Sequence, residues 1–129
     1  MMKETDKRKI LIVDDEAHIR LLIAQSLEEL EDQGVAILIA EDGDEAVEIV
    51  QKEHPGLVFL DVMMPRMNGF EVSENIKKKL GFNDVKIVLL TAKGQDFDRK
   101  RGEEVGADVY MTKPFDPDEL LTIAEKFIS

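Results

Sequence analysis

Five short and mostly apolar runs, separated by longer amphipathic stretches, dominate the pattern of this chain. The runs cover residues 10–13, 35–40, 57–60, 85–90 and 109–111. They are short and rich in branched aliphatic residues, which is typical of strands buried on both faces. Each run is therefore predicted to form a strand of a parallel sheet.

The stretches between the runs carry apolar residues at helical spacing. They predict helices over about 16–33, 42–54, 70–80 and 96–105, and from 117 onward. Asp42 with Glu45, and Asp116 with Glu119, have the spacing of helix caps, and Pro117 suits a first helical position. Gly102 makes the helix over 96–105 the weakest prediction, because glycine costs about 1 kcal/mol relative to alanine inside a helix.

Strict alternation of strand and helix predicts an α/β fold, a doubly wound five-stranded parallel sheet with helices on both faces. In such sheets, ligands bind beyond the carboxyl ends of the strands. The chain of 129 residues, 43% of them hydrophobic, suffices for one domain with a sizeable core.

Polar residues follow four of the five predicted strands. Asp14 and Asp15 end the first, Asp61 the third and Thr91 the fourth, and Lys113 follows the fifth. Converging carboxylates repel one another unless a cation neutralises them, and Mg²⁺ prefers carboxylates, waters and a substrate phosphate. An oxygen of Asp61 could then attack a phosphoryl group, with Lys113 sharing the charge and Thr91 donating a hydrogen bond. Alone, each of these residues would pass for an ordinary surface or strand-end residue.

Composition limits the partners and the metal chemistry. A net charge of −11 would repel nucleic acid, so no direct nucleic-acid contact is expected. There is no cysteine, and only His18 and His54 offer imidazole, so a metal site must be built from oxygen. The first apolar run is too short to span a bilayer, and the basic residues before it are not followed by an apolar segment that ends in a small-residue cleavage site, so neither a membrane span nor a signal peptide is expected. A cytoplasmic protein without membrane insertion is expected.

Four motifs identify a family. They are ILIVDDE at 10–16, LDVMMP at 60–65 with NG at 68–69, LTA at 90–92, and GADVYMTKPF at 106–115. In this order and spacing, the chain resembles the receiver domain of bacterial response regulators from residue 9 to about 127. The resemblance implies a flavodoxin-like strand order 2-1-3-4-5 and a single receiver domain over 1–129. It also implies a phosphoacceptor regulator that catalyses only its own phosphorylation and dephosphorylation, not a turnover enzyme.

The resemblance assigns the metal ligands. Asp61 would be the phosphoacceptor, and Asp15, Asp61 and the backbone carbonyl of Met63 would bind Mg²⁺, with Asp14 acting through a water.

Met63 offers no hydrogen bond to an attacking water, so a long-lived phosphorylated state is expected, which Lys93 could reinforce.

The resemblance also assigns the switch. Lys113 would contact the phosphoryl group, Thr91 would move toward that group, and Tyr110 would reorient with Thr91. Separately, the Lys113 side chain is predicted to meet solvent until the phosphoryl group arrives. The Lys113-Pro114 bond is predicted to be cis. The phosphoryl donor would be a histidine kinase or a phosphotransfer protein, or acetyl phosphate in its place. Because the helix weakened by Gly102 stands beside Thr91 and Tyr110, the fourth helix, fifth strand and fifth helix are expected to present the output surface to an unknown partner protein or output domain.

Three other functions are compatible with the predicted fold. A phosphatase with an aspartyl nucleophile would need a second acid where Met63 stands. In a flavin-binding protein, Asp14 and Asp15 would repel the cofactor phosphate. A binding module without phosphorylation would have no use for the complete set of Asp14, Asp15, Asp61, Thr91 and Lys113. A stand-alone regulator and a receiver excised from a longer protein both remain open. The lysines at 77–79 are expected to be a solvated helix end that suits the helix dipole.

Overall fold

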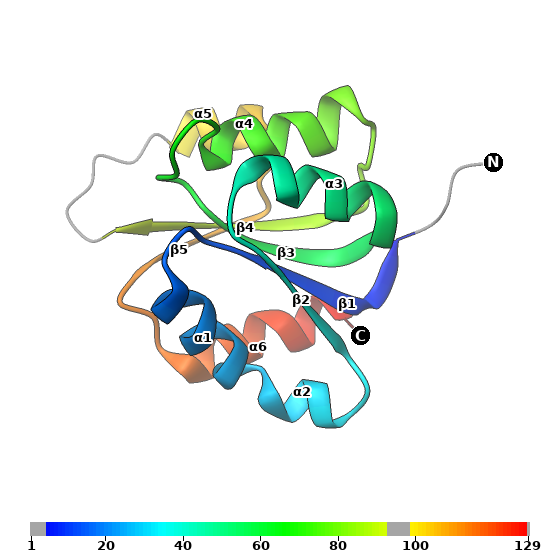
Figure 1. Cartoon of the computed structure of the whole chain (residues 1–129), viewed down its shortest axis with the longest axis vertical. Coiled ribbons are helices and arrows are strands. Elements are labelled where there is room, and N and C mark those ends of the chain that lie inside the picture. The colour runs from blue at the N-terminus through cyan, green and yellow to red at the C-terminus, as the bar shows by residue number, and fades with distance from the viewer. Residues whose placement is uncertain (1–4, 93–98, 129) are drawn as a thin grey trace.

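The computed structural model of the chain describes residues 5–92 and 99–128, and within them five parallel strands form one sheet (Figure 1). The strand order is β2-β1-β3-β4-β5, which confirms the predicted flavodoxin-like order. The strands are β1 (Asp6–Val13), β2 (Ala36–Ala40), β3 (Pro55–Asp61), β4 (Lys86–Ala92) and β5 (Val109–Lys113).

Helices cover both faces of the sheet, as the alternating pattern predicts. Figure 1 shows α1, α2 and α6 on one face and α3, α4 and α5 on the other. The helices are α1 (Ala17–Ser26), α2 (Glu28–Asp32), α3 (Gly43–Glu53), α4 (Gly69–Glu74), the π-helical turn η1 (Asn75–Lys79), α5 (Arg99–Glu104) and α6 (Pro117–Ile128). No helix in the described residues is long and apolar enough to cross a membrane.

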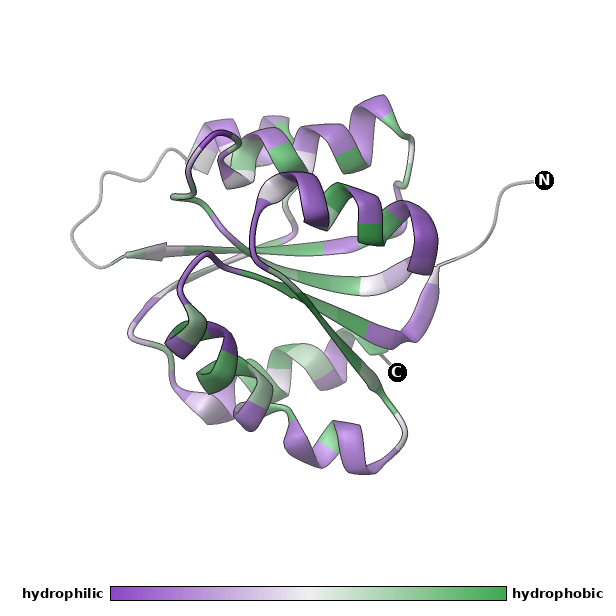
Figure 2. Cartoon of the chain, viewed as in Figure 1, coloured by the Kyte–Doolittle hydropathy of each residue, from purple (hydrophilic) through white to green (hydrophobic). Residues whose placement is uncertain are grey.

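The sheet separates two apolar cores, because alternate residues of a strand point to opposite faces. In β1, Ile10 and Ile12 pack toward α1 and α6, whereas Leu11 and Val13 pack toward α3 and α4. All four side chains are fully buried. Figure 2 shows the strands hydrophobic along most of their length and the helices mixed. Because the strands are packed on both faces, the positions of their carboxyl ends are well defined.

Two predicted helices are interrupted. The helix expected over 16–33 divides at Leu27, next to Ser26, whose hydroxyl bonds back to the Leu22 carbonyl at 2.8 Å. Such local hydroxyl bonds compete with helical geometry. The helix expected over 70–80 changes at Asn75 from α-helix to a π-helical turn. The helix expected over 96–105 is described from Arg99, since residues 96–98 lie outside the described part.

Helix starts follow local capping chemistry. The Asp42 carboxylate accepts the Glu45 N–H at 2.8 Å, as predicted. Asn68 and Glu71 form a reciprocal capping box at the start of α4, which the sequence analysis did not identify although the spacing is present. This cap fixes α4 directly after the loop that leaves Asp61.

Candidate functional site

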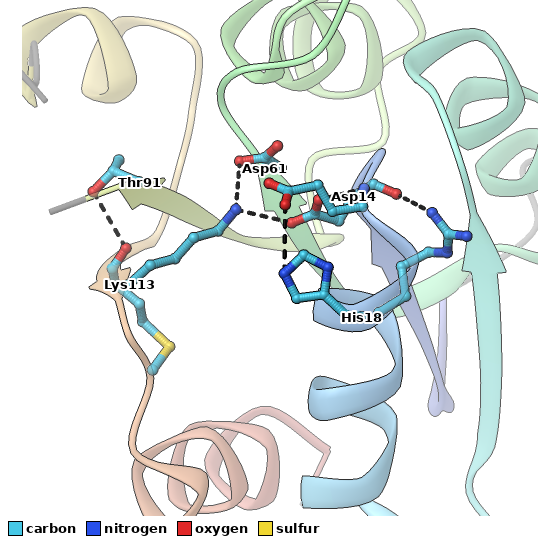
Figure 3. A network of polar contacts seen from close by, with 8 residues as sticks. Asp14, His18, Asp61, Thr91 and Lys113 are labelled. Atoms are coloured by element: carbon cyan, nitrogen blue, oxygen red, sulfur yellow. Dashed lines mark hydrogen bonds and ion pairs between the residues drawn. The ribbon is translucent and has the colours of Figure 1, made fainter.

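The residues predicted to converge lie together at the carboxyl edge of the sheet. Asp14 follows β1, Asp61 ends β3, and Lys113 ends β5. Figure 3 shows the Lys113 side chain reaching from β5 toward Asp14 and Asp61. The Lys113-Pro114 peptide bond is cis, which confirms that prediction. Strands far apart in sequence thus bring two acids and one amine to the same place.

Lys113 bridges the two carboxylates. Its Nζ lies 3.1 Å from Asp14 Oδ2 and 3.3 Å from Asp61 Oδ1. Only 17% of the Lys113 side chain is exposed, and both aspartates are buried. The expectation that Lys113 meets solvent before phosphorylation is therefore wrong. Two buried carboxylates attract the nearest ammonium, and Lys113 can reach both.

One amine does not balance these acids. Burial raises the pKa of Asp61 from 3.8 to about 6, and the Asp14 charge adds to the rise while Lys113 opposes it. Burial also raises the pKa of Asp14, against hydrogen bonds from the Glu16 N–H and Lys113. Burial lowers the pKa of Lys113, but the two carboxylates outweigh it, so its pKa is raised overall. The cluster retains surplus negative charge at neutral pH.

The surplus charge and the donor atoms suit a hard divalent cation. Carboxylate oxygens of Asp14, Asp15 and Glu16 lie within 4.8 Å of one another. Asp15 is also close enough to contribute to the raised pKa of Asp61. A set made of oxygen atoms fits Mg²⁺ rather than a softer metal. Glu16 was given no role from the sequence, although the consecutive acids at 14–16 signal it.

The two residues predicted to switch, Thr91 and Tyr110, lie on the neighbouring strands β4 and β5. The Thr91 hydroxyl donates to the Met111 carbonyl at 3.4 Å and so points toward β5 (Figure 3). Tyr110 packs on α5, where a Cβ added at Gly102 would clash with the Tyr110 hydroxyl and ring. Gly102 therefore provides the space that the tyrosine occupies, and it is not merely a weak point in the helix.

Two further residues near the site are Met63, which the sequence analysis considered, and Arg20, which it did not. Met63, two residues after Asp61, exposes 61% of its surface, while its predicted companion Lys93 lies outside the described residues. Arg20 was missed altogether. Its guanidinium donates to the Asp14 backbone carbonyl at 2.7 Å. A charged residue on an amphipathic helix gives no signal that distinguishes such a contact from a solvated side chain.

Comparison with known proteins agrees with this geometry. The family profile described as "Response regulator receiver domain" matches residues 10–125. The "Probable transcriptional regulator ycf27" of Cyanophora paradoxa is 46% identical over 117 residues, which are 91% of this chain and 46% of the relative. The "Phosphate regulon transcriptional regulatory protein PhoB" of Escherichia coli is 42% identical over 114 residues, 88% of this chain and 48% of the relative. The chain therefore spans about half the length of these relatives.

A solved structure extends the similarity to the whole fold. The chemotaxis protein CheY4 of Vibrio cholerae, crystallised at low pH, has a TM-score of 0.81 at 30% identity. The match covers 97% of this chain and 99% of that one.

Proposed function

This chain belongs to the response regulator receiver domain family, and we propose that Asp61 is the phosphoacceptor of its phosphorylation switch. The observation that carries this proposal is the buried, acid-rich cluster at the strand ends, in which Lys113 lies 3.3 Å from Asp61. All five strands belong to one sheet, which supports a single receiver domain over residues 1–129.

The proposed reaction is the transfer of a phosphoryl group to a carboxylate oxygen of Asp61. The oxygen forms a bond to phosphorus while the bond from phosphorus to the donor's leaving group breaks. With a pKa of about 6, Asp61 is mostly ionised at neutral pH and available as the nucleophile. Lys113, already beside this carboxylate, stabilises the charge of the phosphoryl oxygens. The chain acts as a phosphoacceptor and not as a turnover enzyme.

Asp15, Asp61 and the Met63 backbone carbonyl would hold Mg²⁺, with Asp14 contributing through a water. The chemistry that Mg²⁺ supplies when bound is neutralisation of charge on the carboxylates and the phosphoryl oxygens. The Asp15 carboxylate lies close to those of Asp14 and Glu16, and its charge contributes to the raised pKa of Asp61. Both observations support a shared cation site for Asp15 and Asp61. The Asp14 and Asp61 side chains would have to share Lys113 with the incoming phosphoryl group.

The switch would run from Asp61 to the surface of α5, β5 and α6. Thr91 would exchange its bond to the Met111 carbonyl for one to the phosphoryl group, and Tyr110 would move with it. Because Tyr110 lies against Gly102, a change in the tyrosine would shift α5. The donor would be a histidine kinase or a phosphotransfer protein, and the receiver of the signal an output domain or partner protein.

Labelling with acetyl phosphate tests the proposal. In the presence of Mg²⁺, the wild-type chain should gain one phosphoryl mass that hydroxylamine removes. Asp61→Asn should abolish labelling, whereas Asp32→Asn makes the same change at an exposed aspartate of α2 and should retain it. Equal labelling of Asp61→Asn and wild type, or labelling undiminished by EDTA, would refute the assignment.

A further inference from the structure

In the part of the chain that the structure describes, no side-chain contact orients the Asp15 carboxylate. Among the described residues it accepts no hydrogen bond and forms no ion pair, and its side chain is exposed. The neighbouring Asp14 side chain, in contrast, is buried and bonded at both oxygens, to the Glu16 N–H at 2.9 Å and to Lys113. Any fixed orientation of Asp15 must therefore come from the chain on either side of it.

Arg20 of α1 donates a hydrogen bond to the peptide unit between Asp14 and Asp15. Its Nη1 donates to the Asp14 carbonyl oxygen at 2.7 Å, and its Nη2 lies 3.5 Å from Glu41 Oε1. Only 14% of the Arg20 side chain is exposed. The Asp14 N–H, which belongs to the preceding peptide unit, donates to the Ala40 carbonyl at 3.4 Å. Among the described residues, the Arg20 guanidinium is the donor that holds the carbonyl of the peptide unit between Asp14 and Asp15.

We propose that Arg20 is a positioning residue for the cation site, acting through the peptide plane between Asp14 and Asp15. A peptide unit is planar, so fixing the Asp14 carbonyl also fixes the Asp15 N–H and the Asp15 Cα. The Cα from which the Asp15 side chain extends toward the cation site then has a defined position. This inference rests on the proposed function, since it assumes that Asp15 binds Mg²⁺.

The electrostatic effect of Arg20 has the opposite sign, which makes the proposal testable. A guanidinium near a cation site repels the cation, so removing its charge alone should strengthen Mg²⁺ binding. Loss of positioning should weaken binding, as it does when groups that orient metal ligands are removed. A fall in affinity on neutralising Arg20 would therefore identify positioning and not charge.

The experiment is a Mg²⁺ titration of the unphosphorylated protein, followed by NMR through the backbone amides at constant ionic strength. Arg20→Gln should bind Mg²⁺ roughly ten-fold more weakly than wild type, and Arg20→Lys should lie between them. Arg8→Gln is the matched control, because it also removes one charge and one arginine-to-carbonyl bond, to Gln33, but on another part of the chain. It should bind like wild type.

The outcomes separate this inference from the proposed function. If wild type shows no Mg²⁺ binding at the amides of residues 14–16 and 61, the proposed function fails. If wild type binds there and Arg20→Gln binds equally or more tightly, only the positioning role is overturned. Should Arg20→Gln be partly unfolded, the folded Arg20→Lys protein decides, since its affinity must still fall below that of Arg8→Gln.

Discussion

Two lysines lie in buried ionic clusters at opposite ends of the sheet, and they differ in charge balance. In the Lys77 cluster (Lys77, Asn83, Ile87 and Asp108), the Lys77 Nζ lies 3.2 Å from both Asp108 Oδ2 and the Asn83 carbonyl. The same Asp108 oxygen accepts the Ile87 N–H at 2.8 Å. One amine meets one carboxylate, and Lys77 is only 9% exposed.

In the Lys113 cluster (Asp14, Asp61 and Lys113), one amine meets two buried carboxylates. Asp15 nearby adds a third negative charge, which contributes to the raised pKa of Asp61. The Lys77 cluster lies where β4 and β5 begin, and the Lys113 cluster lies where strands end. Burial of an ion pair alone therefore does not mark a functional site. The surplus of one sign of charge does, because a ligand of the other sign can remove it.

The largest effect should come from breaking the balanced cluster. Asp108→Ala leaves Lys77 buried without its carboxylate and removes the acceptor of the Ile87 N–H. We expect a loss of about 3–5 kcal/mol in the free energy of unfolding, measured by urea denaturation. A loss below about 1 kcal/mol would mean that water or the Asn83 carbonyl replaces the pair, and the two clusters would then not differ as described.

Asp61→Asn should raise the free energy of unfolding, whereas Asp108→Ala should lower it. The pKa of Asp61 is raised from 3.8 to about 6 by folding, so the folded state holds the proton more tightly than the unfolded chain. The ionised Asp61 carboxylate therefore destabilises the folded state. This destabilisation is complete above about pH 6 and absent below about pH 4, where the carboxyl is protonated in both states. In EDTA, Asp61→Asn should thus be more stable than wild type by about 1–3 kcal/mol at neutral pH.

The pH profile of urea unfolding checks this sign. The advantage of Asp61→Asn should shrink as the pH falls through about 6 and vanish near pH 4. A variant less stable than wild type at neutral pH would show that the bond to Lys113 outweighs the cost of burying the charge.

Magnesium should substitute for one lysine and not for the other. Lys113→Ala leaves two buried carboxylates without an amine, and Mg²⁺ can neutralise them. At ten times its dissociation constant, Mg²⁺ should restore about 1.4 kcal/mol, with tighter binding than in wild type because no ammonium competes. In Lys77→Ala the cation should give no more stabilisation than in wild type. Equal rescue of both variants would contradict the difference between the clusters.

The smallest effect is a local one. Beryllofluoride with Mg²⁺, which mimics a phosphoryl group, should change hydrogen exchange at Thr91 and Tyr110 by roughly ten-fold. Amides of the balanced cluster, at Ile87 and Asp108, should change little because their contacts do not depend on the ligand. Changes concentrated in residues 17–32 would show that α5, β5 and α6 are not the output surface.

Much of the fold could be predicted because it depends on apolar patterning. Runs buried on both faces mark the strands, and alternation with helices leaves few topologies for a parallel sheet. The strand order 2-1-3-4-5 came from the resemblance to a family. The residues at the strand ends were predicted for the same reason, since Asp61 and Lys113 stand where a buried run stops.

Individual charge pairs could not be predicted, because periodicity says which face is buried and not which residues meet. Lys77 was expected to be solvated in a run of three lysines, yet it pairs with Asp108, 31 residues away. Lys113 was expected in solvent, and its partner Asp14 is 99 residues away. Arg20 gave no signal for the same reason. The break at Leu27 reflects a local competition between hydrogen bonds that apolar spacing does not record.

The most direct test of the proposal that Asp61 accepts the phosphoryl group is to locate the modification. After treatment with acetyl phosphate and Mg²⁺, borohydride reduces an aspartyl phosphate to homoserine, which tandem mass spectrometry of peptides assigns to one residue. We predict homoserine at position 61 and unmodified aspartate at 14 and 15. Homoserine at 14 or 15, or a phosphoryl group on another side chain, would contradict the proposal.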